Sequence, residues 1–243
     1  MRAHVGFLAA ILAVAAGVVL PGWRASTESR DLTRPMVAEV AAPASAGAPR
    51  TSPGALDVDP AWIRRTAAAT GIPEPAVRAY GRAALTAPAQ CRLGWTTLAG
   101  IGWIESHHGT LGGSELGSDA VPVPPIVGPA LDGSPGVRAI PATAEGTALH
   151  GDTRWERAVG PLQFLPSTWA QWSRDGDGDG RADPRDLDDA AAAAAAYLCE
   201  GARDLSTGAG WSAAVWSYNA SAAYVRDVHG SASTYAARMT TSP

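Results

Sequence analysis

The sequence contains no lysine, because every one of its 19 basic residues is an arginine. Without a lysine amine the chain lacks the group needed for Walker-A phosphate binding, Schiff-base formation, kinase catalysis and Ser-x-x-Lys acyl transfer. Two cysteines are too few for a structural zinc site of their own, and a net charge of −4 argues against nucleic acid as the main partner. The sequence does have 46% hydrophobic residues over 243 positions, enough to bury the core of one domain.

The N-terminal residues differ in composition from the rest and are expected to lie outside the folded domain. Residues 1–21 begin with an arginine and an uncharged run, the pattern of a secretory signal peptide or an N-terminal membrane anchor, and the pattern leaves both open. Residues 22–56 are rich in Ala, Pro, Ser and Thr without apolar periodicity, which predicts a flexible linker. We therefore expect an exported chain with one domain over residues 57–239, which contacts a membrane only if residues 1–21 stay attached.

Export determines the expected state of the two cysteines. Cys91 and Cys199 are predicted to form a disulfide, because exported proteins meet oxidising surroundings. The two lie far apart in the sequence, so the bridge would close a long loop and stabilise the fold mainly by restricting the unfolded chain. The alternative is a pair of buried free thiols.

The folded part reads as a series of helices, so the predicted fold class is mainly α. Asp59 and Pro60 have the pattern of an N-cap followed by proline at the first helical position, and Gly71 ends that helix. Apolar periodicity predicts further helices over residues 75–86, 94–107, 167–172, 188–200, 211–218 and 222–238.

The remaining stretch, residues 111–159, contains many Pro and Gly and has no periodicity. We expect a long ordered loop region there, with no strand pair, and such loops inside compact domains are more often functional than idle. The aromatic residues Trp62, Trp95 and Trp211 are expected to pack in the core.

The acidity is concentrated in residues 175–189, where seven aspartates accompany two arginines. The spacing fits the twelve-residue EF-hand calcium loop, with Gly180 at the sharp turn of position 6 and an aspartate at the last position where glutamate is usual. The predicted ligands are Asp175, Asp177, Asp179, the backbone carbonyl of Arg181, Asp183 and Asp186. One such loop predicts a structural Ca²⁺; the alternative is an acidic, glycine-rich solvent loop.

Glu105 lies in an unusual setting for a glutamate, near the C-terminal end of an apolar predicted helix. Apolar neighbours and the negative end of the helix dipole would both raise the pKa of its carboxyl group. A carboxylic acid that stays protonated near neutral pH is what a glycosidase needs to protonate a leaving oxygen. Taken alone, the residue is as well explained as a surface glutamate at a helix end.

Three short segments occur in order along the chain: Glu105-Ser106, Gly160-Pro161-Leu162-Gln163-Phe164-Leu165-Pro166 and Tyr218-Asn219. Together they resemble the motif set of the lytic transglycosylases of the lysozyme-like superfamily. The aspartate-rich loop between the second and third segments narrows the resemblance to the membrane-bound lytic transglycosylase B type. The cysteine positions and the preference for arginine narrow it further, to the shorter actinobacterial form. The resemblance covers roughly residues 57–238 and implies a lysozyme-like fold with an embedded EF-hand-like loop.

The resemblance also implies a substrate and roles for single residues. The substrate would be the glycan strands of peptidoglycan, so the protein would work in the cell wall or on the outer face of the cytoplasmic membrane. Glu105 would be the only catalytic acid/base, cleaving the bond between N-acetylmuramic acid and N-acetylglucosamine with formation of a 1,6-anhydro end. The residues implied to hold the sugar or line the cleft are Gln163, Phe164, Tyr218, Asn219 and, less specifically, Tyr224.

Two other interpretations, a hydrolase and a wall-binding protein, stay open at this stage. A lysozyme-type hydrolase would need a second carboxylate facing Glu105, and residues 111–159 offer Glu115, Asp119, Asp132 and Asp152. A non-catalytic wall-binding protein on the same fold would have no use for an intact acid motif. The adjacent histidines that follow Glu105 lack the His-Glu-x-x-His spacing of zinc enzymes. A monomer is the default expectation.

Overall fold

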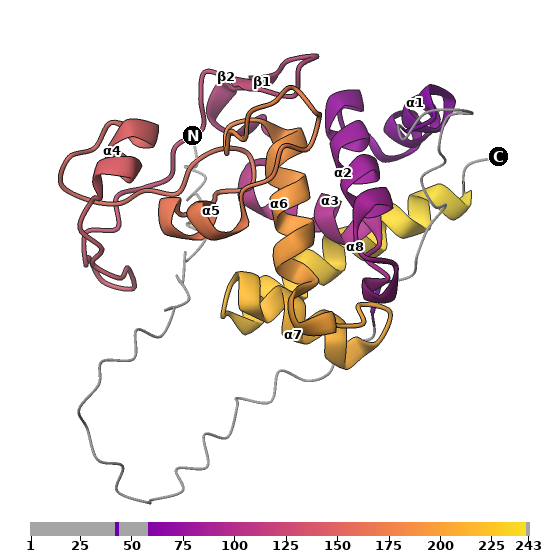
Figure 1. The fold of residues 1–243 in the computed structure, drawn as a ribbon. Coiled ribbons are helices and arrows are strands. Elements are labelled where there is room, and N and C mark those ends of the chain that lie inside the picture. The colour runs from indigo at the N-terminus through magenta and orange to yellow at the C-terminus, as the bar shows by residue number, and fades with distance from the viewer. Residues whose placement is uncertain (1–41, 44–57, 242–243) are drawn as a thin grey trace, which may run out of the picture.

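The computed structural model describes residues 42–43 and 58–241. The predicted signal or anchor over residues 1–21 therefore lies outside the described residues, as does the predicted linker except for Ala42 and Pro43. Eight α-helices account for half of the described residues (Figure 1): α1 (Pro60–Thr70), α2 (Glu74–Thr86), α3 (Trp95–Ser106), α4 (Ala144–His150), α5 (Pro166–Trp172), α6 (Leu187–Leu198), α7 (Gly208–Tyr218) and α8 (Ala222–Thr241). The mainly α prediction is confirmed.

The region over residues 111–159 has more structure than its sequence pattern predicts. It contains a short helix, α4, and a two-stranded antiparallel pair made by β1 (Glu115–Leu116) and β2 (Pro122–Val123). Three one-turn 3₁₀ helices complete the described chain: η1 (Ala89–Cys91), η2 (Leu111–Gly113) and η3 (Glu200–Ala202). The expectation of no strand pair was wrong, because strands of two residues leave no alternation to detect.

Local sequence signals account for the ends of several helices. The side chain of Asp59 accepts a hydrogen bond from the backbone N–H of Ala61 at 2.8 Å, and Pro60 occupies the first helical position of α1. Gly71 ends the same helix with φ = 77°, a left-handed conformation that glycine adopts without strain. At the start of α6, the side chain of Asp186 accepts from the N–H of Asp188 at 2.7 Å.

The nearly apolar helix α3 forms the middle of the core and packs against α2, α6 and α8 (Figure 1). Its residues from Trp95 to Gly102 are buried on all sides. At Gly100, a Cβ atom would lie 2.7 Å from the carbonyl oxygen of Val228, so the glycine permits the close approach of α3 and α8. Trp62, Trp95 and Trp211 are all buried, which confirms that they pack in the core.

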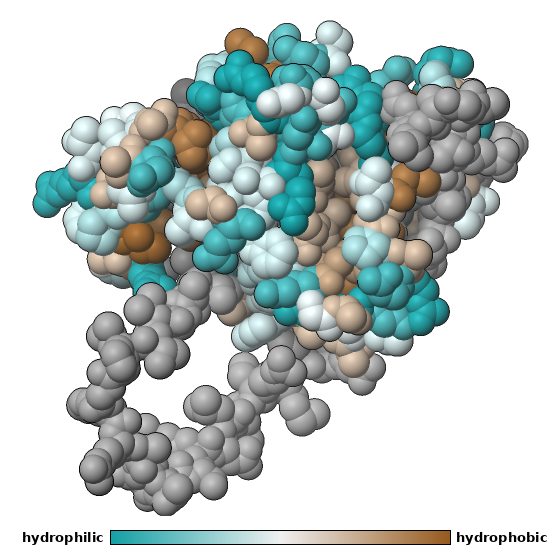
Figure 2. Space-filling model, viewed as in Figure 1, coloured by the Kyte–Doolittle hydropathy of each residue, from teal (hydrophilic) through white to brown (hydrophobic). Residues whose placement is uncertain are grey.

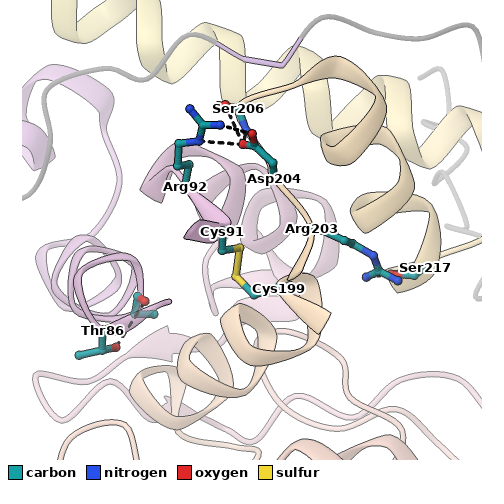
Figure 3. The surroundings of a disulfide bond; sticks show 9 residues. Thr86, Cys91, Arg92, Cys199, Arg203, Asp204, Ser206 and Ser217 are labelled. Carbon is teal, nitrogen blue, oxygen red and sulfur yellow. Dashed lines mark hydrogen bonds and ion pairs between the residues drawn. A yellow bond between two sulfur atoms is a disulfide. The ribbon is translucent and has the colours of Figure 1, made fainter. Parts of the chain in front are cut away.

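One disulfide crosses the domain, between Cys91 in η1 and Cys199 at the end of α6 (Figure 3). The Cα atoms are 5.5 Å apart, and 108 positions separate the two residues in the sequence. The predicted bridge is confirmed. Next to it, Arg92 and Asp204 form a two-pronged ion pair that ties η1 to the segment before α7.

The surface viewed in Figure 2 is mostly polar, and its strongly hydrophobic residues occur singly or in small groups. Within the part of the chain that the structure describes, none of the helices combines the length and the apolar character needed to cross a bilayer.

Candidate active site

Glu105 lies in the last turn of α3 and is partly buried. The helix ends at His107, whose left-handed backbone (φ = 50°) returns its N–H to the carbonyls of Gly102 and Trp103. The phenolic O–H of Tyr224, from α8, donates to Oε1 of Glu105 at 2.6 Å. Burial raises the pKa of Glu105 to about 7, and the hydrogen bond from Tyr224 opposes that rise. The carboxyl group is therefore half protonated near neutral pH.

Two tyrosines enclose the carboxyl group. The rings of Tyr218 and Tyr224 are parallel within 8°, with their centroids 6.5 Å apart. Burial and the neighbouring charge of Glu105 raise the pKa of both phenols well above the usual value, so both stay protonated. Tyr218 donates its O–H to the carbonyl of Leu162 at 2.8 Å, which fixes its ring against the second motif.

The segment Gly160–Pro166 is held against the C-terminal end of α3 by Ser106, the residue after Glu105. Its Oγ donates to the carbonyl of Pro161 at 2.6 Å and accepts from the N–H of Gly109 at 2.8 Å. The serine thus joins the first motif to the second, a role that sequence reasoning missed because it depends on a contact between residues far apart in the chain.

Gln163 occupies a left-handed backbone position (φ = 50°) directly after this anchored segment. Its Nε2 donates to the carbonyl of Gly160 at 2.9 Å. A Cβ atom at Gly128 would lie only 2.6 Å from its Oε1, so a larger residue there would displace the side-chain amide of Gln163. The amide of Gln163 is therefore positioned by backbone on two sides.

The other two predicted site residues are buried. Phe164 is 3% exposed and packs edge-on against Trp169 and Tyr218, so it supports the tyrosine ring from the core side. Asn219, at the C-cap of α7, is 7% exposed and follows Tyr218 directly. The structure thus brings Glu105, Tyr218 and Tyr224 into one cluster, with Phe164 behind it.

The acids of the loop region are engaged in local contacts. Asp152 accepts from the N–H groups of Arg154 and Trp155 and from the side chain of Arg157, and these bonds lower its pKa to about 2. Asp132 and Asp119 accept from nearby backbone N–H groups, and Glu115 is exposed in β1. Burial and Tyr224 are the causes that shift the pKa of Glu105, and neither is a second carboxylate.

The two histidines after Glu105 do not form a metal site. His108 is 2% exposed, with its Nδ1 3.1 Å from the hydroxyl of Tyr80 and its Nε2 2.8 Å from the hydroxyl of Tyr235. Burial lowers the pKa of His108 to about 3, so the ring is neutral and joins α2 to α8 through two hydrogen bonds. His107 is stacked on the exposed ring of Trp103.

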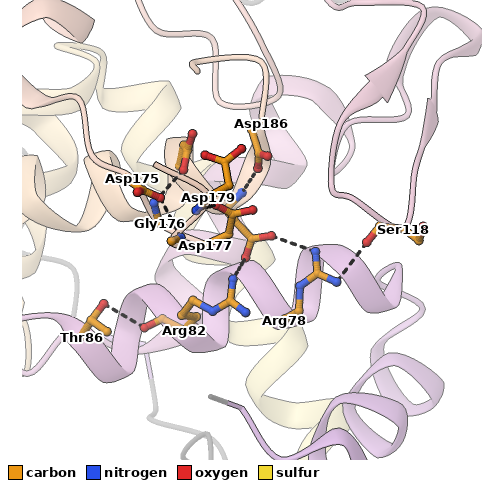
Figure 4. Close-up of polar contacts among 12 residues, drawn as sticks. Arg78, Arg82, Thr86, Ser118, Asp175, Gly176, Asp177, Asp179 and Asp186 are labelled. Carbon is orange, nitrogen blue, oxygen red and sulfur yellow. Dashed lines mark hydrogen bonds and ion pairs between the residues drawn. The ribbon is translucent and has the colours of Figure 1, made fainter. Parts of the chain in front are cut away.

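The aspartate-rich loop gathers carboxylates above α2 (Figure 4). Oxygens of Asp175, Asp177 and Asp189 lie within 4.8 Å of one another, a group that fits a metal ion. Burial is the largest cause of the raised pKa of Asp189, and the negative charges of Asp177 and Asp175 raise it further. A hard cation prefers carboxylate oxygens and would relieve this repulsion, so the residues present fit Ca²⁺.

Sequence reasoning missed Asp189, which belongs to the first turn of α6 and folds back onto the loop. Its carboxylate accepts from the N–H of Gly176 at 2.6 Å and from that of Asp183 at 2.8 Å. Asp188, next to it, pairs instead with Arg78 and Arg82 of α2, each at 2.8 Å; Figure 4 labels both arginines on that helix.

The other predicted ligands have additional contacts. Asp179 accepts from the N–H of Arg181, Asp183 is paired with Arg185, and Asp186 caps α6. Burial raises the pKa of Asp186 to about 7. Arg181, whose backbone carbonyl is the remaining predicted ligand, lies in the loop directly after the bend at residues 176–180. Their assignment as ligands stays a prediction.

The comparison with known protein families gives one match over this region. Residues 145–222 match the family model described as "Transglycosylase SLT domain". The matched span contains Gln163, the aspartate-rich loop and Asn219, while Glu105 and Tyr224 lie on either side of it. A search of curated proteins and a search of solved structures returned no match. A domain similar to the transglycosylase SLT family is therefore present in the chain.

Proposed function

We propose that the protein is a peptidoglycan lytic transglycosylase of the membrane-bound B type. It cleaves the β-1,4 bond between N-acetylmuramic acid and N-acetylglucosamine and leaves a 1,6-anhydromuramoyl end, with Glu105 as the single acid/base. The observation that carries the proposal is the carboxyl group of Glu105, whose pKa is about 7 and which receives a hydrogen bond from Tyr224. The match of residues 145–222 to the transglycosylase SLT family supports the substrate class.

In the first step, the protonated carboxyl group of Glu105 donates its proton to the glycosidic oxygen, and the bond to C1 of the muramoyl residue breaks. The raised pKa supports this role, because it keeps a usable fraction of the acid protonated at neutral pH. Tyr224 supplies the one hydrogen bond to Oε1 that stabilises the carboxylate formed by the transfer.

In the second step, the Glu105 carboxylate takes the proton of the muramoyl C6 hydroxyl as that oxygen closes on C1. Atoms balance without water: the proton gained from the hydroxyl restores the acid. One carboxyl group is sufficient for both steps, in agreement with the local hydrogen bonds that engage Asp119, Asp132 and Asp152. Gln163 and Asn219 hold the sugar, and the Tyr218 ring, supported by Phe164, forms the wall of the cleft.

The same proposal implies where the protein works and how its chain is organised. The substrate is the glycan strand of peptidoglycan, and a disulfide-bonded enzyme acting on it works outside the cytoplasm. Residues 1–21 direct export or hold the enzyme at the outer face of the membrane, and residues 57–239 form its catalytic domain. Ca²⁺ in the loop of residues 175–189 stabilises the fold. A monomer is sufficient for this chemistry, since the cluster around Glu105 is complete within one chain.

The experiment is mass spectrometry of purified peptidoglycan after digestion with the full chain in the presence of calcium. The proposal predicts muropeptides one water lighter than the corresponding reducing-end products. Glu105→Gln should abolish them, because an amide cannot transfer the proton. Glu115→Gln, the same change on an exposed glutamate of the loop region, should leave the yield unchanged.

Two other results would contradict the proposal in different ways. Products with reducing ends, lost in Glu105→Gln, would make the enzyme a hydrolase and would require a second carboxylate near the cleft. Binding of the chain to peptidoglycan without any product would make it a wall-binding protein on the same fold.

A further inference from the structure

Two residues of the predicted linker, Ala42 and Pro43, lie against the folded domain. Ala42 is partly buried and packs against the hydrophobic core. Together they close one side of a hollow of about 250 Å³. The rest of its lining comes from the start of α3 and from the segment that leads into α7, namely Arg92, Gly94, Thr96, Thr97, Leu205, Ser206 and Trp211. We refer to these seven residues as the α3–α7 groove.

The α3–α7 groove is fixed by bonds that do not involve the linker. The N–H of Leu205 donates to the carbonyl of Cys91 at 2.8 Å, directly beside the disulfide. The indole N–H of Trp211 donates to Oγ1 of Thr97 at 3.0 Å, and Arg92 is paired with Asp204 (Figure 3). The groove is therefore formed before anything binds in it, which lowers the entropic cost of occupation.

The chemistry of the α3–α7 groove suits an Ala-Pro segment. Leu205 and Trp211 give it an apolar floor and are only 3% and 1% exposed. Proline has no N–H that would need a partner there, and its fixed φ limits the conformational freedom lost on docking. At the rim, Arg92 and Asp204 are already paired with each other, so an uncharged segment can dock without breaking that ion pair.

We propose that the α3–α7 groove is an intramolecular docking site for the chain's own Ala42–Pro43 segment. A chain of the length of residues 44–57, which separate the segment from Val58, can span at most about 45 Å. The consequence is geometric. With the segment docked, the linker leaves the domain at the N-terminal end of α3, while Glu105 lies near the C-terminal end of this 12-residue helix, about 18 Å away at most along its axis.

The docking site therefore fixes the N-terminal end of α3 as the point from which residues before Ala42 leave the domain, and Glu105 lies near the other end of that helix. The proposal concerns the attachment of the domain and does not depend on the reaction that Glu105 performs.

The test compares two variants of the full chain by amide hydrogen exchange. In Ala42→Arg/Pro43→Gly a long charged side chain replaces the partly buried Ala42, and the segment loses the fixed φ of proline. In the matched control, Ala48→Arg/Pro49→Gly, the same changes fall on a second Ala-Pro pair of the linker. We expect exchange at Thr97, Leu205 and Thr207 to become at least threefold faster in the first variant and to stay unchanged in the control.

A second measurement detects the contact directly. In the unchanged chain, a nuclear Overhauser cross-peak is expected between the methyl group of Ala42 and protons of Leu205 or Trp211, and it should disappear in Ala42→Arg/Pro43→Gly. Equal exchange in all three proteins together with no cross-peak would overturn the proposal. Protection that grows with protein concentration would also overturn it, because the groove would then hold the linker of a second copy.

Discussion

The phenolic oxygen of Tyr224 lies 2.6 Å from Oε1 of Glu105, although 119 positions separate the two residues in the sequence. The pair joins the end of α3 to the first turn of α8, and the packing of those two helices brings it together. Because the tyrosine donates to the carboxylate form, it works against burial and keeps the pKa of Glu105 lower than burial alone would.

Removing the hydrogen bond from Tyr224 should shift the fall in activity to a higher pH. In Tyr224→Phe the pKa of Glu105 rises above about 7, since the opposing hydrogen bond is lost. The limb on which activity falls with rising pH should shift by roughly one pH unit, which corresponds to about 1.4 kcal/mol. The measurement is kcat/KM for peptidoglycan between pH 5 and 9.

The matched control is Tyr235→Phe, the same change on the same helix. The hydroxyl of Tyr235 contacts His108 and not Glu105, so its loss should leave the position of the limb unchanged. An equal shift in both variants, or a downward shift in Tyr224→Phe, would remove the tyrosine from this role.

The raised pKa also predicts how stability depends on pH. The usual pKa of a glutamate is 4.5 and that of folded Glu105 is about 7, so between these values the folded state binds more protons than the unfolded state. Stability therefore falls as pH rises through this window. Glu105→Gln cannot ionise, and it should be more stable than the unchanged protein by about 1–3 kcal/mol at pH 8, and by much less at pH 5.

Urea unfolding at both pH values, at one fixed calcium concentration, measures the difference. Glu115→Gln serves as the control, because an exposed glutamate should give the same small difference at pH 5 and pH 8. The quantity to compare is the gain in stability of Glu105→Gln over the unchanged chain at each pH. A gain that is smaller at pH 8 than at pH 5 would show that burial does not hold the carboxyl group protonated.

The metal proposal predicts different effects of calcium on variants of Asp189 and Asp186, which lie three positions apart. Calcium should raise the Tm of the unchanged chain by several degrees, since a ligand that binds the folded state stabilises it. Asp189→Asn should lose most of this increase, because Asp189 belongs to the group of converging oxygens. Asp186→Asn should keep it, since asparagine is as good an N-cap for α6 as aspartate.

Thermal unfolding with calcium and with a chelator gives the increase for each variant, independently of any loss of stability without metal. The opposite result, with the increase lost in Asp186→Asn and kept in Asp189→Asn, would support the twelve-residue ligand spacing instead.

The disulfide should make a large contribution to stability. The Cys91–Cys199 bridge closes a loop of about a hundred residues, and the chain-entropy model assigns about 4–5 kcal/mol to a loop of that length. Urea unfolding of Cys91→Ala/Cys199→Ala should show a loss of this order, and a reductant should produce a similar loss in the unchanged chain. Coincident unfolding curves for the bridged and unbridged proteins would refute the expectation.

The sequence predicts those parts of the fold that depend on local signals. The ends of α1 follow from Asp59, Pro60 and Gly71 because caps and turns involve neighbouring residues. In contrast, α4 and the β1–β2 pair escaped prediction, since seven helical residues and strands of two are too short to establish a period.

The candidate site divides in the same way. Glu105 could be singled out because its apolar setting is visible along one helix, and burial is the cause that raises its pKa. The roles of Ser106 and Asp189 could not, because each acts through partners brought near only by folding. The burial of Phe164 likewise depends on α5 and α7, which pack around its ring.

The aspartate-rich loop touches the segment that carries Gln163. At Gly160 a Cβ atom would lie only 1.8 Å from the carbonyl oxygen of Pro184, so the two loops are in direct backbone contact there. Asp183, whose N–H donates to Asp189, directly precedes Pro184. If the loop holds the proposed cation, its loss would act on this contact next to Gln163, and we expect a chelator to lower activity without competing with the proposed glycan substrate.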